Sequence, residues 1–208
     1  MRGYFFLIFL LLTPPVHVEV IDRVAASAGN RVITHSDILR EIRLSAFMNR
    51  TKPDFSLDAR KKAAERLVER VLIENEMELG KYAAPQLSDI ESELSALKRG
   101  DFPTADSYGI RDEDLKLYLL QQVAVVRFID ARFGPAVQLL ESDMRDYYSE
   151  HIVRQWDNKS GKPAPAFDEV REQIGEVLRA ERANALVAEW LKEVKARTRI
   201  DFRPEAFQ

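Results

Sequence analysis

The 208-residue chain contains no cysteine. This absence excludes disulfide bridges, thiol nucleophiles and thiolate metal sites, although it does not decide the compartment, because many exported bacterial proteins also lack cysteine. Histidine is nearly as scarce: His17, His35 and His151 are the only three, and none has a second ligand at metal-binding spacing. We therefore expect no metal site and a structural role for each histidine.

Glycine-rich loops are also missing, because the eight glycines are all isolated in the sequence. This excludes the kind of loop that cradles phosphate groups. Two carboxylate clusters, Asp112-Glu113-Asp114 and Asp168-Glu169, precede apolar periodic segments. Negative charge is favourable at the first turn of a helix, so these clusters predict helix starts rather than general acid–base groups. We expect neither an enzyme nor a cofactor.

A strong excess of charge of one sign is absent as well. The net charge is −3, from 31 Lys and Arg against 34 Asp and Glu, with both signs interspersed. A nucleic-acid binder needs a concentrated basic face. The most basic stretch, residues 192–203, is explained by cations near a helix C-terminus, where the helix dipole favours them. We therefore expect no nucleic-acid partner.

An apolar run from Tyr4 to Leu12 follows Arg2 and ends before Pro14. A basic start, a short apolar stretch and a break are typical of a secretory signal, and a membrane-spanning helix would need about 20 apolar residues. Residues 1–18 are therefore predicted to be a signal peptide that exports the protein. Residues 16–19 lack the small side chains of a cleavage site, so a tether formed by an uncleaved signal is an open alternative.

The remaining sequence predicts a mainly helical domain. Residues 20–34 alternate around Gly29-Asn30, a dipeptide typical of tight hairpin turns, and Ser36-Asp37 offers capping oxygens for a helix to about Asn49. Apolar residues at helical spacing predict further helices. Long helices are expected at 57–82, 111–133 and 167–197. Shorter helices are expected to begin at Ser88-Asp89, ending before Gly100, and at Ser142-Asp143.

The periodicity also predicts which side chains point inward. The inward stripe of the 111–133 helix includes Leu119 and Val126, and that of the 167–197 helix includes Val177, Leu186 and Trp190.

A short strand is expected after the last helix. A two-stranded ribbon is marginally stable alone. We therefore predict that residues 199–203 join residues 22–34 in one small sheet.

Three blocks of the sequence resemble the SurA, PpiD and PrsA group of exported foldases. IDRVAASAGNRVITHSDILREI at 21–42 resembles the opening strand, turn, strand and capped helix of that family. AAERLVERVLIENEMELGKYA at 63–83 is similar to its long helix. FDEVREQIGEVLRAERANALVAEWLKEVKARTRIDF at 167–202 is similar to the C-terminal helix and strand that rejoin the N-terminal half. The resemblance implies a mainly α chaperone domain like the N-terminal domain of SurA, with a small β-sheet formed by the N-terminal hairpin and the C-terminal strand.

One departure from the family changes the implied activity. The family carries one or two parvulin-type prolyl isomerase domains before its last helix, whereas here only residues 153–166 fill that interval, and the parvulin signature is missing. The resemblance thus implies a single chaperone domain in two parts, 19–152 and 167–208, joined by a linker at 153–166. It implies a holdase for unfolded or nascent exported polypeptides, as in outer-membrane assembly, without prolyl isomerase activity. A degenerate relative acting as an adaptor subunit of a cell-envelope complex is the alternative, and a homodimer is also open.

A holding chaperone must leave apolar surface unburied, because binding depends on the apolar area removed from water. We looked for large apolar residues where the helical pattern lapses. These are Phe47 and Met48 at a helix end, and Phe102 and Tyr108 in the 100–110 loop. Methionine suits the role because its side chain adapts to varied partners. These four are the candidate peptide-binding residues; the alternative is that they hold the loop against the body.

Overall fold

The computed structural model describes residues 22–99, 103–156 and 163–207. Within these ranges it contains six α-helices and one three-stranded antiparallel sheet, so the predicted mainly helical class with a small sheet is confirmed. The elements in chain order are β1 (Val24–Ala28), β2 (Arg31–Thr34), α1 (His35–Met48), α2 (Leu57–Leu79), α3 (Glu91–Arg99), α4 (Asp112–Phe133), α5 (Glu141–Tyr147), α6 (Phe167–Arg197) and β3 (Ile200–Phe202).

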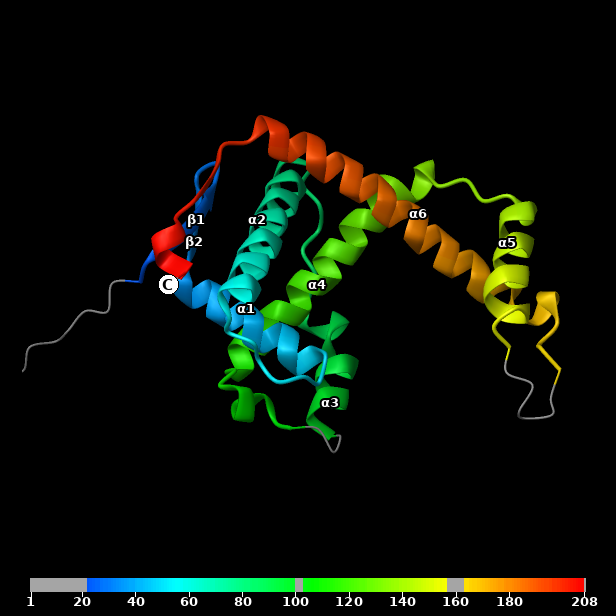
Figure 1. Ribbon diagram of the computed structural model, residues 1–208, viewed down its shortest axis with the longest axis horizontal. Helices are drawn as coiled ribbons and strands as arrows, with labels where there is room; N and C mark the ends of the chain where they lie inside the picture. The colour runs from blue at the N-terminus through cyan, green and yellow to red at the C-terminus, as the bar shows by residue number, and fades with distance from the viewer. Residues whose placement is uncertain (1–21, 100–102, 157–162, 208) are drawn as a thin grey trace, which may run out of the picture.

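The sheet joins the two ends of the domain. Its strand order is β2-β1-β3, and Ser27 in β1 lies opposite Asp201 in β3. Gly29 has a φ of 61°, the left-handed conformation that the tight turn between β1 and β2 requires. Figure 1 shows the red C-terminal segment running beside the blue hairpin. The predicted association of residues 199–203 with residues 22–34 is therefore confirmed.

The cap of α1 differs from the prediction. Thr34 is the N-cap, with its Oγ1 accepting from the Asp37 amide at 3.3 Å, while the Asp37 carboxylate accepts from the Thr34 amide at 2.9 Å. This reciprocal capping box begins the helix at His35, before the predicted Ser36-Asp37 cap. The reason is that β2 runs directly into the helix, so that its last strand residue supplies the cap. The amide of Ser36 bonds instead to Asp22, at 3.2 Å.

Two hydrophobic clusters form the body of the molecule. The larger lies between the sheet, α1, α2, the end of α4 and the C-terminal part of α6, and has Phe128 at its centre, fully buried. The smaller joins the end of α1, α3, the start of α4 and the short helical turn η2 (Ala105–Tyr108). Because α4 contributes to both clusters, it holds the two parts of the body together.

Beyond this body, α6 runs outward and carries α5 at its far end (Figure 1). The two helices pack closely at Gly175 on α6, where an added Cβ would lie in van der Waals contact with Met144 Sδ on α5, at 3.6 Å. The guanidinium of Arg145 lies 4.4 Å from the centroid of the Phe167 ring, which fixes α5 against the first turn of α6. We call α5, the adjoining η4 (Tyr148–Val153) and the N-terminal half of α6 the arm.

No helix among the described residues is long and apolar enough to cross a bilayer. The predicted signal peptide, residues 1–18, lies outside the described residues, as does the 157–162 part of the predicted linker.

Candidate functional site

The structure brings together three of the four candidate peptide-binding residues. Phe47 is 5% exposed and packs edge-on against Tyr108, with ring centroids 5.6 Å apart. Met48 is partly buried against the same smaller cluster. Phe102 lies outside the described residues. This packing favours the alternative that these side chains hold the loop against α1, and their binding of peptide stays a prediction.

A groove with apolar walls lies between α4 and α6, at the point where the arm leaves the body. It encloses about 420 Å³. Its lining comes from α4, from the segment after it and from α6: Val126, Ile129, Asp130, Gly134, Val137, Glu176, Arg179, Ala180, Ala183 and Asn184. The lining combines aliphatic side chains with charged side chains of both signs, and its aliphatic part suits an apolar group.

Several exposed apolar residues of α4 and α6 are ones that periodicity placed inside. Val126 on α4 is 56% exposed, and Val177 and Leu186 on α6 are 41% and 39% exposed. The expectation that these three are buried is wrong, whereas Leu119 and Trp190 are buried as predicted. The reason is that helical spacing identifies an apolar stripe but not the length of it that a neighbouring element covers. The sequence therefore carries no signal that would have identified these exposed residues.

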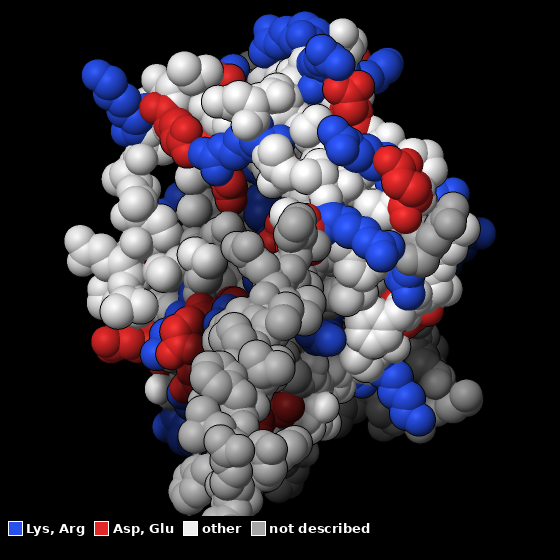
Figure 2. Space-filling model, turned by 90° about the vertical axis from the view of Figure 1, so that its left-hand side faces the viewer, with Lys and Arg blue, Asp and Glu red and all other residues white. Residues whose placement is uncertain are grey.

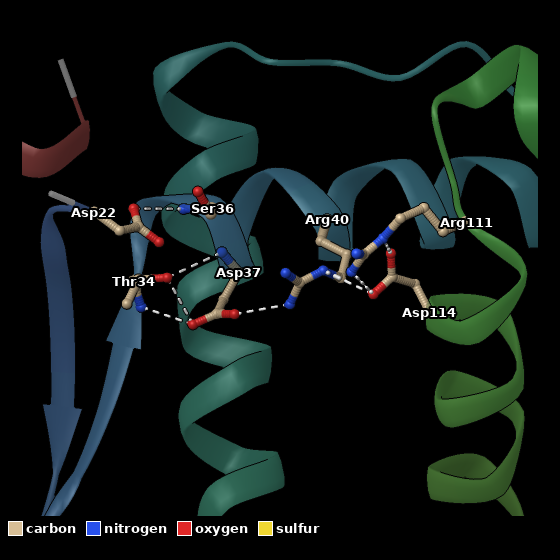
Figure 3. A network of polar contacts seen from close by, with 7 residues as sticks. All are labelled: Asp22, Thr34, Ser36, Asp37, Arg40, Arg111 and Asp114. Atoms are coloured by element: carbon tan, nitrogen blue, oxygen red, sulfur yellow. Dashed lines mark hydrogen bonds and ion pairs between the residues drawn. The ribbon is translucent and has the colours of Figure 1, made fainter. Parts of the chain in front are cut away.

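A chain of polar contacts ties α1 to α4 (Figure 3). Arg40 on α1 contacts Asp37 at 2.9 Å and Asp114 on α4 at 3.4 Å, and Arg111 contacts Asp114 at 2.7 Å. The Arg111 hydrogen bond and then the positive charge of Arg40 lower the pKa of the Asp114 carboxyl. Because Asp37 also caps α1 with Thr34, the network fixes the start of α4 relative to the hairpin.

A second groove, of about 310 Å³, lies between β2 and α4, and its charged lining residues form ion pairs with one another. Glu41 is 4% exposed and accepts from Arg70 at 2.9 Å and from Arg66 at 3.2 Å. Burial, and then the negative charge of Glu41, raise the pKa of the nearby Tyr118 phenol. A buried acid with two arginine partners is satisfied, so this groove is part of the frame of the domain.

In the described part of the chain, no group of three or more His, Asp or Glu side chains gathers closely enough to hold a metal ion. On the face at the sheet end of the molecule, Figure 2 shows lysines and arginines interspersed with acidic side chains.

No protein-family model matches the chain, and no curated protein matches it.

Proposed function

We propose that the protein is an exported holding chaperone of the SurA type, which binds unfolded polypeptides in the periplasm and has no prolyl isomerase activity. The observation that carries the proposal is the groove between α4 and α6, where apolar side chains line a cavity of about 420 Å³ and Val126 is left more than half exposed. The volume of the groove is enough for apolar side chains of an extended chain.

Apolar contact suits a protein that must hold many different chains. Removing apolar surface from water contributes roughly 25 cal/mol per Å² and depends little on orientation. Such contacts need no cofactor and select no particular sequence. A few partly exposed side chains therefore give weak, reversible binding, which is what a holdase requires.

The sheet supports the same proposal through chain topology. It holds the first and last segments of the domain together, whereas both ends of the predicted linker lie at the arm, far from the sheet (Figure 1). The Tyr148 hydroxyl donates to the Pro165 carbonyl at 2.7 Å and fastens the two sides of this interval to each other. In a relative that has an isomerase domain, that domain would be inserted at this interval, between α5 and α6. Here the interval is short, and the chaperone module is proposed to act alone.

The deciding experiment is suppression of aggregation by the chain from residue 19 onward. Several unrelated proteins are unfolded and diluted into buffer with increasing amounts of this protein, and light scattering is followed. A holdase lowers the scattering of all of them near a one-to-one ratio. Suppression of none of them would contradict the proposal and favour a fixed adaptor subunit, which would instead be recovered with one constant partner.

A further inference from the structure

The outer strand β3 leaves a sheet edge uncovered. It pairs only with β1, and no strand among the described residues lies on its other side. An edge strand presents unpaired backbone N–H and C=O groups along its free side, and these pair readily with another extended chain. The edge of β3 is therefore a binding surface of defined chemistry.

The printed hydrogen bonds show which residues of β3 face β1. The Gly29 amide donates to the Arg199 carbonyl and the Arg203 amide donates to the Ala25 carbonyl, each at 2.9 Å. Backbone groups in antiparallel pairs point alternately toward the partner strand and away from it. The residues at 199, 201 and 203 thus turn their backbone groups toward β1.

Ile200 and Phe202 consequently direct their N–H and C=O groups away from the sheet. No backbone hydrogen bond to a turn, loop or helix end of the described chain occupies these groups. The two residues are spaced as one extended partner requires, because every second residue of a strand faces the same neighbour. One added strand would accept and donate up to four hydrogen bonds here.

A small pocket lies beside this edge. It encloses about 190 Å³ and is lined by Lys61 and Glu65 of α2 together with Phe202, Pro204 and Phe207. Phe202 is 44% exposed, whereas Phe207 is buried and forms part of the larger hydrophobic cluster. The pocket is thus lined by apolar side chains of the strand and the segment after it, and by two charged side chains of α2.

The polar groups at the edge indicate the occupant. Lys61 and Glu65 have opposite signs, so the pocket lining has no net charge that would select an anion or a cation. The outward N–H and C=O groups of Ile200 and Phe202 are what an occupant must pair with. Their complement is the main chain of an extended polypeptide, and the complement of the pocket is an uncharged apolar side chain.

We propose that the free edge of β3 binds an extended segment of an unfolded polypeptide by strand addition, with one apolar side chain of that segment in the pocket beside Phe202. The inference rests on the proposed function, because the bound segment belongs to the client. It adds a mode of recognition: the α4–α6 groove contacts side chains, whereas the β3 edge contacts the main chain, which all clients share.

Amide hydrogen exchange tests the edge directly. The probe is a reduced and carboxymethylated polypeptide that stays unfolded, added at saturation to the chain from residue 19 onward. Exchange of the Ile200 and Phe202 amides should slow at least about tenfold on binding, because each becomes hydrogen-bonded. Exchange of the Asp201 amide, already bonded to β1, should change little. Binding without protection at 200 and 202 would overturn the inference and leave the proposed function standing.

A matched pair of variants separates the amide from the ring. Phe202→Pro removes the outward N–H and the ring, while Phe202→Ala removes only the ring, and proline is tolerated at an edge strand. Phe202→Pro should bind the probe about fivefold more weakly than Phe202→Ala, as expected for one lost hydrogen bond. Equal affinities would contradict strand addition.

The opposite edge supplies a control. Val32 in β2 lies opposite Ser27, and the backbone N–H and C=O groups of Ser27 point toward β3. The backbone groups of Val32 therefore also point away from β1, toward the free side of β2. Val32→Pro should leave affinity for the probe unchanged, and an equal loss there would contradict assignment to β3.

Two further outcomes count against the inference. If the Ile200 and Phe202 amides become protected as the protein alone is concentrated, the edge pairs with a second copy rather than a client. If the wild-type chain binds no unfolded probe at all, the proposed function fails and this inference fails with it.

Discussion

Trp190 on α6 packs against Phe128 on α4, with ring centroids 5.7 Å apart and the planes tilted by 55°. Phe133 lies within 6.0 Å of Phe128 and 5.9 Å of Trp190, which completes a three-ring cluster in the larger core. These rings are where α6 is anchored to the body. The direction of the arm therefore depends on them.

Replacing Trp190 by Ala should destabilise the domain by about 3–5 kcal/mol, because a large buried ring is lost and a cavity remains. Urea unfolding followed by circular dichroism measures this change. Leu186→Ala, at an exposed position on the same helix, is the control and should change stability by about 0.5 kcal/mol or less. A Trp190→Ala variant as stable as that control would show that α6 is not anchored by these rings.

Charge placed in the α4–α6 groove should weaken client binding without unfolding the domain. Val126→Asp introduces a carboxylate at a position that is 56% exposed, so little core packing is lost. Aggregation suppression should require roughly tenfold more protein, because an ion in the groove must be desolvated when an apolar side chain enters. The control is Leu186→Asp on α6, which does not line this groove. Equal suppression by the two variants would place the client elsewhere.

The link between α1 and α4 should be sensitive to acid. The pKa of Asp114 is lowered in the folded state by Arg111 and then Arg40. Its contribution to stability is therefore present above the unfolded pKa of about 3.9 and is lost as the pH falls through the lower folded value.

Asp114→Asn should reduce the free energy of unfolding by about 1 kcal/mol or less at pH 7, since the arginine partners are largely exposed. The difference from the wild type should shrink as the pH falls below about 4, which urea unfolding at several pH values measures. A difference that stays constant down to pH 2.5 would show that the charge of Asp114 is not the cause.

The chain should not accelerate prolyl isomerisation. Exchange at an X–Pro bond is slow, and its catalysis needs a dedicated pocket, which the proposed module has no domain to provide. The test compares the relaxation rate of a proline-containing peptide with and without the purified chain. Acceleration that scales with protein concentration and survives repurification would contradict this prediction.

Local chemistry explains why much of the fold could be predicted from the sequence. Gly29-Asn30 suits the positive φ of a tight turn, and α6 spans Phe167–Arg197 as its periodicity and first-turn acids predicted. Even the pairing of residues 199–203 with the hairpin followed from the weakness of an isolated ribbon. The end of α2 was less accurate: it stops at Leu79, three residues before the predicted end at Tyr82.

The candidate site was harder to predict, because exposure depends on which elements meet. Phe47 sits where the helical pattern lapses, yet α4 and η2 cover it, leaving 5% exposed. Val126 lies within an apolar stripe, yet its neighbours leave it 56% exposed. A sequence pattern records the polarity of a side chain but not the presence of its neighbour.

The sequence by itself determined the type and order of the helices, the hairpin, the closing strand and the absence of cysteine chemistry, because turns, caps and periodicity act over a few residues. Only the tertiary structure decided that α6 extends beyond the body, that Val126 faces an open groove and that β3 ends the sheet with Ile200 and Phe202 facing outward. Those features arise from contacts between distant segments. Their free energy depends on area buried and hydrogen bonds paired across the fold, which no local stretch of sequence contains.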